Sequence, residues 1–495
     1  MLSIFESVFL INHSLFRKML FNSFEFLLFF PLVTLIYFAI PHKYRWFHLL
    51  LASCVFYSFF IPIYILILFF TIIIDYYAGI WIEQSHGKKR KSALIMSLVA
   101  NIGVLSVFKY YNFFIDNFNS ILFKINPDQL LPHWDIILPI GLSFHTFQAM
   151  SYTIEVYRGN QKAERHFGIY ALYVMFYPQL VAGPIERPQN VIHQFYEKHE
   201  FNYELAKSGL RLMLWGMFKK VVIADRLSIF VNKVYGQPTD YQGLPLIVAT
   251  LFFTFQIYCD FSGYSDIAIG SARVMGFDLM KNFDRPYFSK NISEFWRRWH
   301  ISLSTWFRDY LYIPLGGNRV AEYRRYFNLF FVFMMSGLWH GASWHFVIWG
   351  ALHGIYLIFG QLTKRFQETV LGLLKIQLLQ NIIHASITFI LVAFAWIFFA
   401  AHNNADSIYI IKHLFSQNSH SISQIIEIIG ENDLYLILIS VFILEFVQWQ
   451  QRGKLIANHF ESKPKWQQWM AYYLILLMIL CFGVYNNSQF IYFQF

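Results

Sequence analysis

Long apolar runs with almost no charge recur along the chain and give the first prediction. The run from Phe24 to Ile40 has one charge, near its start, and the run from Pro62 to Ile82 has only Asp75. Neither run alternates with the period of 2 or 3.6 residues that is typical of half-buried strands and helices. About 20 apolar residues of helix cross a bilayer core, so each run is predicted to be a membrane span.

The pattern recurs often enough to predict an all-α, polytopic membrane protein with about eleven to thirteen hydrophobic helices. The predicted segments are 24–40, 46–61, 63–82, 92–114, 136–156, 167–183, 207–235, 244–276, 325–342, 344–361, 380–402, 433–450 and 467–485. Some contain an interruption, such as Pro139-Ile140-Gly141, which membranes tolerate where protein shields the backbone. No repeat or soluble domain is evident. We expect one membrane domain over 19–495, and 1–18 is an extension ahead of an equally plausible start at Met19.

The stretch 292–313 has a different pattern. Placed on one helix, its apolar and aromatic residues form a stripe, while its three arginines lie away from that stripe. Such a helix is expected to lie in the membrane interface or to re-enter the bilayer, with Trp at headgroup depth. His300 falls at the edge of the stripe, where it can face a cavity.

Composition supports the membrane prediction. Of 495 residues, 57% are hydrophobic and 14% are charged, against about 25% charged in a soluble domain. The net charge of +10 comes mainly from connecting segments, as expected for cytoplasmic loops and anionic lipid headgroups rather than for a nucleic-acid partner. The densest basic run, Lys88–Lys91, is expected in the cytoplasm, which places the N-terminus outside.

One histidine in an apolar span is a candidate for chemistry. His340 stands in Gly337-Leu338-Trp339-His340-Gly341, where small residues let helices approach closely. Ionisable groups at that depth are by default functional candidates, and the alternative is a neutral histidine hydrogen-bonded to another helix. Periodicity does not choose among His340 and four further histidines, which are His145, His345, His353 and His384. HExxH is absent, and the three cysteines show no paired spacing, so no metal site is predicted.

A second candidate segment places carboxylates and hydroxyls inside a span, at Asp260, Ser262, Tyr264 and Asp266. The two carboxylates are expected to line a cavity or to pair with a base, an arginine elsewhere being the simplest structural partner.

A third segment is cationic and aromatic. Its sequence, Trp296-Arg297-Arg298-Trp299, suits a phosphate-bearing donor at the cytoplasmic face, although arginines that reach lipid headgroups need the same residues. GxSxG, P-loop and GxGxxG motifs are absent, so serine hydrolase, NTPase and dinucleotide-binding functions lack support.

Taken together, these motifs resemble the membrane-bound O-acyltransferase family, in its branch of alginate, cellulose and peptidoglycan O-acetyltransferases. The resemblance extends from about Met19 to the C-terminus. The matching motifs are Arg285-Pro286-Tyr287, Phe295-Trp296-Arg297-Arg298-Trp299-His300, Ser302-Leu303-Ser304, Phe307-Arg308-Asp309-Tyr310, Pro314-Leu315-Gly316-Gly317, Gly337-Leu338-Trp339-His340-Gly341, Ala182-Gly183-Pro184, the Asp260–Asp266 segment and the terminal Phe490-Ile491-Tyr492-Phe493-Gln494-Phe495.

The resemblance implies a ring of helices around a thin core crossed by a tunnel, in a bacterial inner membrane. The invariant histidine of the family matches His340 and a second conserved histidine matches His300. Acetyl-CoA is the implied donor, entering from the cytoplasm, and a polysaccharide is the acceptor outside. Residues expected to contact the donor or line the tunnel are Trp296, Arg297, Arg298, Trp299, Arg308, Asp309, Trp339, Asp260, Ser262, Tyr264 and Asp266.

The residue types fit acyl transfer, because a hydroxyl that attacks a thioester needs a base of near-neutral pKa and histidine has one. We assign His340 as that base, while His300 binds the donor, orients the thioester or stabilises its oxyanion. The chain contains no extramembrane domain with a serine nucleophile, so an exported esterase-like partner is expected to receive the acetyl group. Two alternatives remain, a D-alanyl transfer protein of teichoic acid synthesis and a transporter or flippase of lipid-linked sugar.

Overall fold

The structure is a computed structural model that describes residues 19–181, 183–372, 376–417, 421–451, 463–485 and 490–491. This part of the chain contains helices and connecting segments but no strand. Six helical stretches are long and apolar enough to cross a membrane, namely Pro62–Gln84, Gly87–Ile125, Leu244–Val274, Trp344–Leu362, Gln377–Ala400 and Glu431–Gln450. The prediction of an all-α polytopic membrane protein is confirmed. The predicted extension 1–18 lies outside the described residues.

The chain forms two compact units. The first comprises residues 1–213 and 267–279, and the second comprises 214–266 and 280–495. The helices of the first unit are α2 (Phe24–Ala39), α3 (His42–Ser58), η1 (Pro62–Tyr64), α4 (Ile65–Gln84), α5 (Gly87–Leu105), η2 (Ser106–Tyr110), α6 (Tyr111–Ile125), α7 (Leu142–Arg158), α8 (Phe167–Met175), α9 (Tyr177–Leu180), α10 (Pro188–Val191), η3 (Ile192–Tyr196) and most of α11 (Tyr203–Met217).

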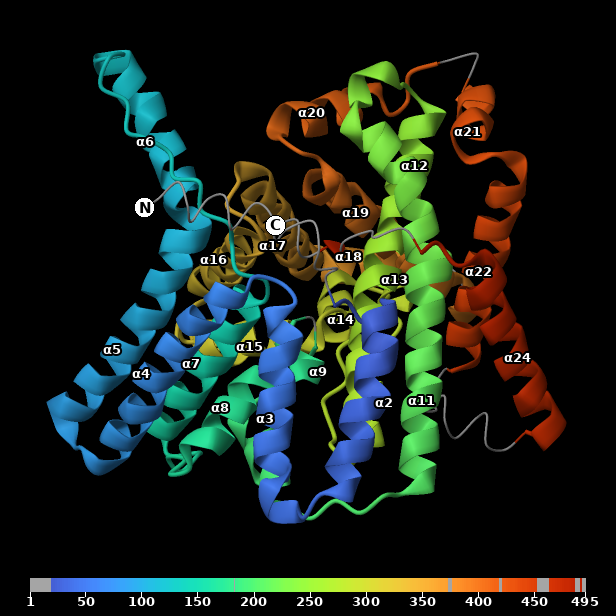
Figure 1. The fold of residues 1–495 in the computed structure, drawn as a ribbon. Coiled ribbons are helices and arrows are strands. Elements are labelled where there is room, and N and C mark those ends of the chain that lie inside the picture. The colour runs from blue at the N-terminus through green and yellow to red at the C-terminus, as the bar shows by residue number, and fades with distance from the viewer. Residues whose placement is uncertain are drawn as a thin grey trace. The chain divides into compact units, whose positions relative to one another are not determined.

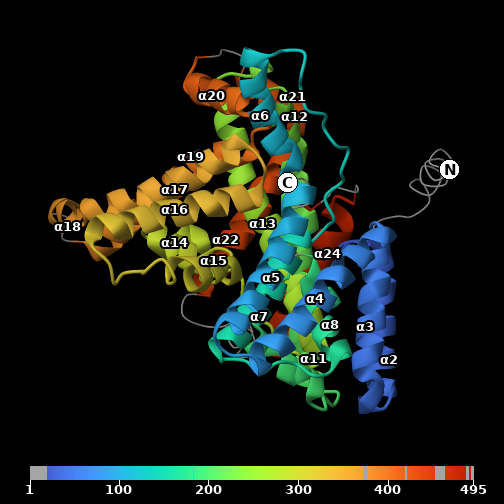
Figure 2. The same cartoon turned by 90° about the vertical axis from the view of Figure 1, so that its left-hand side faces the viewer.

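Helices α4, α5 and α7 lie side by side in the first unit (Figures 1 and 2). A buried polar network joins them, because Asp75 on α4 accepts hydrogen bonds from Ser97 and Asn101 on α5, and the Ser97 hydroxyl lies 2.9 Å from that of Thr153 on α7. Buried polar groups in a membrane protein stabilise only when they are hydrogen-bonded to one another. This network therefore holds the three helices in one register.

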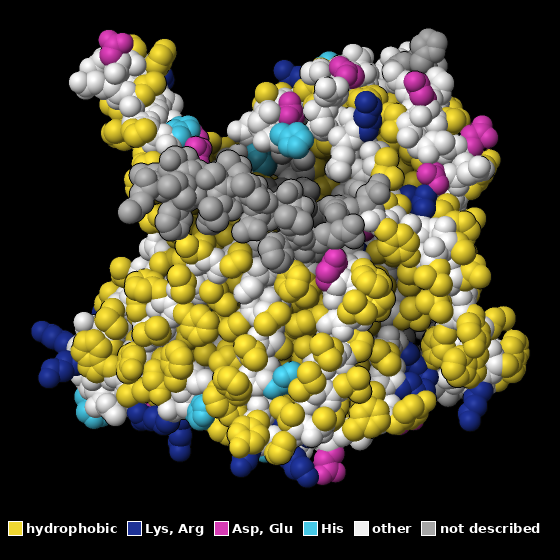
Figure 3. Space-filling view, in the orientation of Figure 1, with side chains coloured by type: hydrophobic (Ala, Val, Ile, Leu, Met, Phe, Trp, Pro, Cys, Tyr) yellow, Lys and Arg dark blue, Asp and Glu magenta, His cyan; other side chains and the backbone are white. Residues whose placement is uncertain are grey.

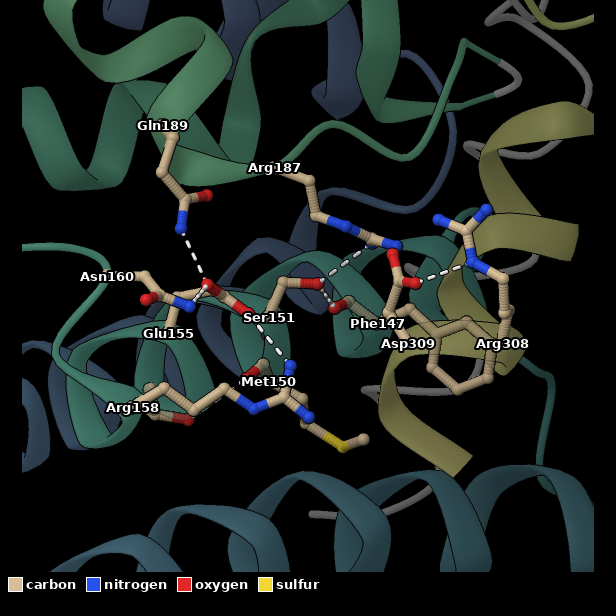
Figure 4. Close-up of polar contacts among 11 residues, drawn as sticks. Phe147, Met150, Ser151, Glu155, Arg158, Asn160, Arg187, Gln189, Arg308 and Asp309 are labelled. Carbon is tan, nitrogen blue, oxygen red and sulfur yellow. Dashed lines mark hydrogen bonds and ion pairs between the residues drawn. The ribbon is translucent and has the colours of Figure 1, made fainter. Parts of the chain in front are cut away.

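The C-terminal end of α7 is fixed by a second polar group, at Glu155. Its carboxylate accepts hydrogen bonds from Asn160 at 2.9 Å and from Gln189 at 2.7 Å, and pairs with Arg158 (Figure 4). The helix stops at Gly159, whose φ of 80° is left-handed, a common C-terminal conformation for glycine. The carboxylate thus ties the end of α7 to the start of α10.

The outer surface of the first unit is apolar where lipid would contact it. Helix α2 exposes large side chains, among them Leu27, Leu28, Leu32 and Leu35, and Figure 3 shows hydrophobic side chains, in yellow, covering this part of the face. A soluble surface would not present so continuous an apolar patch. The exposure agrees with a helix whose solvent is the bilayer.

The second unit contains the N-terminal part of α13, up to Asp266, together with the elements between Leu214 and α13 and those from Met280 onward. Its helices are η4 (Phe218–Ala224), α12 (Asp225–Gly236), η5 (Pro238–Asp240), α13 (Leu244–Val274), η6 (Pro286–Phe288), α14 (Ile292–Arg298), α15 (Ile301–Phe307), η7 (Arg308–Tyr312), α16 (Glu322–His340), α17 (Trp344–Leu362), α18 (Lys364–Gly372), α19 (Gln377–Ala400), α20 (Asn404–His413), α21 (Ser421–Ile429), α22 (Glu431–Gln450) and α24 (Lys465–Phe482).

Helices α16 and α17 pack backbone to backbone through glycines. A Cβ atom added at Gly350 would lie 2.2 Å from the carbonyl oxygen of Phe333, and one at Gly337 would lie 2.2 Å from that of Phe346. Small residues permit this close approach between membrane helices. Because of it, the last turn of α16 lies directly against α17.

One sequence prediction is wrong in detail. The stretch 292–313 is not one amphipathic helix: α14 ends at Arg298, Trp299 is extended, His300 has a left-handed φ of 42°, and α15 then begins. The break is held by hydrogen bonds from outside the stretch, since the backbone N–H of Ile301 donates to the carbonyl of Asn282 at 2.9 Å. Helical periodicity could not reveal a break imposed by a distant segment.

Candidate active site

His340 is the last residue of α16 and is 3% exposed. Its ring meets Trp339, Trp349 and Phe399 at centroid distances of 4.9, 5.0 and 5.4 Å. The next residue, Gly341, lies against the ring of Phe346. A Cβ at position 341 would lie 2.1 Å from that ring, so a larger residue does not fit after His340. The imidazole is thus enclosed by aromatic side chains at the end of α16.

His300 is fully buried at the break between α14 and α15. A left-handed backbone is uncommon for a residue other than glycine, and such strain gathers at functional sites. Asn282 holds the conformation with its side-chain oxygen, which lies 3.2 Å from His300 Nδ1 and accepts from the N–H and the hydroxyl of Ser302. The ring of His300 also stands edge-on to Phe261 at 4.6 Å.

This contact fixes the protonation of His300. Since the oxygen of Asn282 only accepts, Nδ1 of His300 carries the proton, and Nε2 of the neutral ring is an acceptor. Burial lowers the pKa of His300 to about 3, which keeps the ring neutral at physiological pH. The side chain is therefore suited to accept a hydrogen bond at Nε2.

Trp339 connects the two histidines. Its ring lies 4.9 Å from His340 and 6.4 Å from His300. Residues that are 40 positions apart in the chain thus contact one indole, and the expectation that they converge is supported by this geometry within the second unit.

The aromatic members of the Trp-Arg-Arg-Trp segment are buried and its arginines are not. Trp299 is 1% exposed and stacks on Phe295, while Trp296 donates its indole N–H to His353. Arg297 is exposed, and Arg298 pairs with Glu294 at 2.5 Å on the same helix. The tryptophans are thus part of the core around the histidines.

The expected pair Arg308 and Asp309 lies in η7. The two side chains form an ion pair of 2.7 Å (Figure 4), and the side chain of Arg308 is 60% exposed. Its guanidinium remains accessible to a polar ligand or to lipid headgroups.

The polar segment of α13 is an ion-pair network. Asp260 lies 2.7 Å from Lys220 and accepts from the backbone N–H of Ile491, while Asp266 lies 2.6 Å from Lys219. Ser262 accepts from Lys219, and Lys220 lies over the ring of Tyr264. The carboxylates do pair with bases, as expected, but the bases are lysines and not an arginine.

Sequence reasoning missed several of these residues. The adjacent Lys219 and Lys220 in an apolar segment were a usable signal, because lysine at membrane depth needs a partner. Asn282 gave none, since an asparagine between elements has many ordinary uses. His353 was among the histidines that periodicity could not separate.

Comparison with known proteins identifies the family. Residues 165–401, which include both histidines, match the model of the membrane-bound O-acyltransferase (MBOAT) family. The probable alginate O-acetylase AlgI of Pseudomonas aeruginosa is 39% identical over 412 residues, covering 82% of this chain and 77% of that protein.

Two further relatives carry other names. The peptidoglycan O-acetyltransferase of Helicobacter pylori is 38% identical over 76% of this chain and 74% of its own length. The teichoic acid D-alanyltransferase of Bacillus subtilis is 27% identical over 50% of this chain and 65% of its own. These matches agree with the helical membrane fold and with the motif histidines. The chain therefore belongs to the membrane-bound O-acyltransferase family and is a multi-pass membrane O-acyltransferase.

Proposed function

We propose that the protein transfers an acetyl group from a cytoplasmic thioester, acetyl-CoA, towards hydroxyl groups of an extracytoplasmic polysaccharide or of peptidoglycan. The observation that supports this most strongly is the placement of His340, which is buried at the end of α16 and contacts Trp339, as His300 does. Relatives named as alginate and peptidoglycan O-acetyltransferases, at 39% and 38% identity, support the acetyl group and the acceptor class.

His340 is proposed as the general base. The attacking hydroxyl gives its proton to the imidazole as its oxygen bonds to the thioester carbonyl carbon. The tetrahedral intermediate then expels the thiolate, which takes a proton back, so that ester and thiol are the products. A positioned base of this kind contributes about 10²–10⁴-fold to rate.

His300 is proposed to accept a hydrogen bond from the substrate at Nε2. The proton on Nδ1, directed to Asn282, supports an accepting role and not the oxyanion-stabilising role considered above. A buried neutral imidazole accepts from a hydroxyl or thiol without a change of charge in a low-dielectric site. His300 then orients the reacting group for His340.

The donor is proposed to approach from the cytoplasm. Arg297 and Arg308 are exposed, so their guanidinium groups can reach the phosphates of a coenzyme, and planar guanidinium is well suited to phosphate. We also propose that Lys88–Lys91 are cytoplasmic and the N-terminus lies outside, in a bacterial inner membrane, because dense basic loops stay in the cytoplasm.

The acceptor step is proposed to need an exported partner. Helices and short connections make up the described chain, which leaves little surface to select sites on a long polymer. A separate esterase-like protein that receives the acetyl group and modifies the glycan would supply that selection.

Reconstitution tests the proposal. The purified protein is placed in liposomes with labelled acetyl-CoA on the side of residue 89 and glycan on the other. Label should reach the glycan only when the exported partner is added. Efficient transfer without a partner contradicts the relay, and no label on either protein or glycan contradicts acetyl-CoA as donor. Transfer from a D-alanyl carrier protein instead would assign the teichoic acid function.

A further inference from the structure

Three aromatic side chains beyond His340 form a buried cluster in the second unit. Trp349 and His353 lie one turn apart on α17, at a centroid distance of 5.1 Å, and Trp396 on α19 stacks on Trp349 at 5.5 Å. Their exposed fractions are 0%, 0% and 1%. Helices α17 and α19 run side by side in both views (Figures 1 and 2).

The cluster adjoins the proposed base directly. The ring of Trp349 lies 5.0 Å from that of His340 and perpendicular to it. His340 and His353 therefore flank the same indole, much as His340 and His300 flank Trp339.

The hydrogen bond to Trp296 determines the tautomer of His353. The indole N–H of Trp296 donates to Nδ1 of His353 at 3.2 Å. An indole nitrogen can only donate, so Nδ1 is the unprotonated nitrogen and the proton is on Nε2. His353 thus presents an N–H donor at Nε2, the opposite of the acceptor that His300 presents.

Within the described part of the chain, three buried donors of this cluster have no hydrogen-bond acceptor. They are Nε2 of His353 and the indole Nε1 atoms of Trp349 and Trp396. A buried donor without an acceptor costs about 1–3 kcal/mol, and buried polar groups are paired in the great majority of cases. The three donors stand on side chains whose rings contact one another beside a proposed catalytic base, and a ligand with acceptor atoms only would satisfy them.

We propose that His353, Trp349 and Trp396 form the subsite that binds the carbonyl oxygen of the acyl group. This inference rests on the proposed function. A thioester carbonyl oxygen accepts hydrogen bonds and carries no proton, which matches the three donors. When the hydroxyl oxygen bonds to the carbonyl carbon, the C=O electron pair moves to this oxygen, and the donors stabilise the resulting oxyanion until the thiolate leaves. The aromatic rings would contact the short methyl group.

The first test measures acetylation in cells, so that it does not depend on the identity of the donor. A strain without its own copy of the gene receives wild-type, His353→Leu or His353→Gln, at equal membrane levels. Leu has a similar volume and no donor, and we expect at least a 100-fold lower initial rate of polymer acetylation. Gln places an amide N–H near the position of Nε2, so the rate of His353→Gln should be at least tenfold higher than that of His353→Leu.

A matched control is available on the same helix. His345 is buried on α17 and its Nδ1 contacts the carbonyl oxygen of Phe398 at 2.9 Å, so His345→Gln should stay within threefold of wild-type. A His353→Leu rate within threefold of wild-type, or equal losses in the Leu and Gln variants, would overturn the subsite. Absence of acetylation by wild-type itself would refute the proposed function, and this inference with it.

The second test asks whether the cluster recognises a carbonyl. Two unreactive thioethers of coenzyme A are compared, acetonyl-CoA with a carbonyl oxygen and propyl-CoA without one. Wild-type protein in detergent should bind acetonyl-CoA at least tenfold more tightly, and Trp396→Phe and His353→Leu should each reduce that preference. Equal affinity of wild-type for both thioethers would overturn the proposal. If wild-type cells acetylate polymer yet neither thioether binds, coenzyme A is not the donor, and the cell assay decides the subsite.

Discussion

Two buried histidines, His300 and His353, are held in opposite tautomers and so offer different hydrogen-bonding groups. Asn282 keeps the proton of His300 on Nδ1, and Trp296 keeps the proton of His353 on Nε2. One ring therefore offers an acceptor and the other a donor. His340 lies between them, against Trp339, which contacts His300, and against Trp349, which contacts His353. Neutral groups preset in this way act in a dry site without being reoriented during the reaction.

Asn282 is expected to be a positioning residue for His300. Asn282→Ala removes the acceptor for Nδ1 and for Ser302, and it frees a strained backbone, so we expect about 10–100-fold slower acetyl transfer. The membrane level of the variant is the control. Asn282→Asp keeps the acceptor but adds a charge that would raise the pKa of His300. Protonation of His300 would remove its acceptor at Nε2, so the activity of this variant should fall more steeply than that of wild-type as the pH is lowered from 8 to 5. Identical pH profiles for the two proteins would contradict the assignment.

The lysines opposite Asp260 and Asp266 are expected to contribute to stability. Lys220→Met leaves Asp260, which is 3% exposed, without its cation, and breaking a buried pair in this way costs about 3–5 kcal/mol. The thermal midpoint in detergent should fall clearly. Lys198→Met is the matched control, because Lys198 pairs with Glu200 where both side chains are more than 60% exposed, and such pairs contribute about 0–1 kcal/mol. Equal midpoints for the two variants would show that the Asp260 network is dispensable.

At the element scale, the sequence predicted which segments are helical far better than where helices break. Apolar runs identified the segments that form α4, α13, α17, α19 and α22. A helix that crosses a bilayer is apolar along most of its length, so its composition alone reveals it. The break at His300 depends on Asn282, and the start of α7 at Leu142 follows the left-handed Gly141. The carbonyl of Asn282 accepts from Ile301 N–H, and a Cβ at position 141 would lie 2.7 Å from the carbonyl oxygen of Leu180. Segments distant in the sequence therefore fix both features, and the periodicity of one segment did not contain them.

The glycine contact between α16 and α17 is expected to set the position of His340. Gly350→Ala introduces a methyl group 2.2 Å from the carbonyl oxygen of Phe333, which forces the helices apart and should lower acetyl transfer at least tenfold. Gly360→Ala on the same helix meets nothing within 4 Å and should keep activity while slightly stabilising the helix. Similar activities for the two variants would mean that the contact does not determine the site.

For the whole molecule, the motifs predicted the family, and composition alone predicted that the chain is a membrane protein. The catalytic pair His300 and His340 was named from motifs and remains a prediction, although the structure places both against Trp339. The surrounding subsite of Trp349, His353 and Trp396 could not be named from sequence, because buried aromatic residues in a membrane protein are ordinarily part of the core.

Orientation is a separate prediction for the whole chain. A cysteine introduced by Lys89→Cys should resist a membrane-impermeant thiol reagent in intact cells and react after the membrane is opened, because dense basic loops stay in the cytoplasm. A cysteine at Ile63 should react in intact cells. Labelling of residue 89 from outside would reverse the orientation and with it the proposed side of donor entry.

Acyl transfer with His340 as the base is tested by one comparison in cells. A strain without its own copy of the gene receives wild-type or His340→Ala, matched for membrane level, and the acetyl content of its cell-envelope polymers is measured after a pulse of labelled acetate. We expect wild-type to restore acetylation and His340→Ala to remain at the level of the empty strain. Acetylation by His340→Ala at the wild-type level would contradict the account.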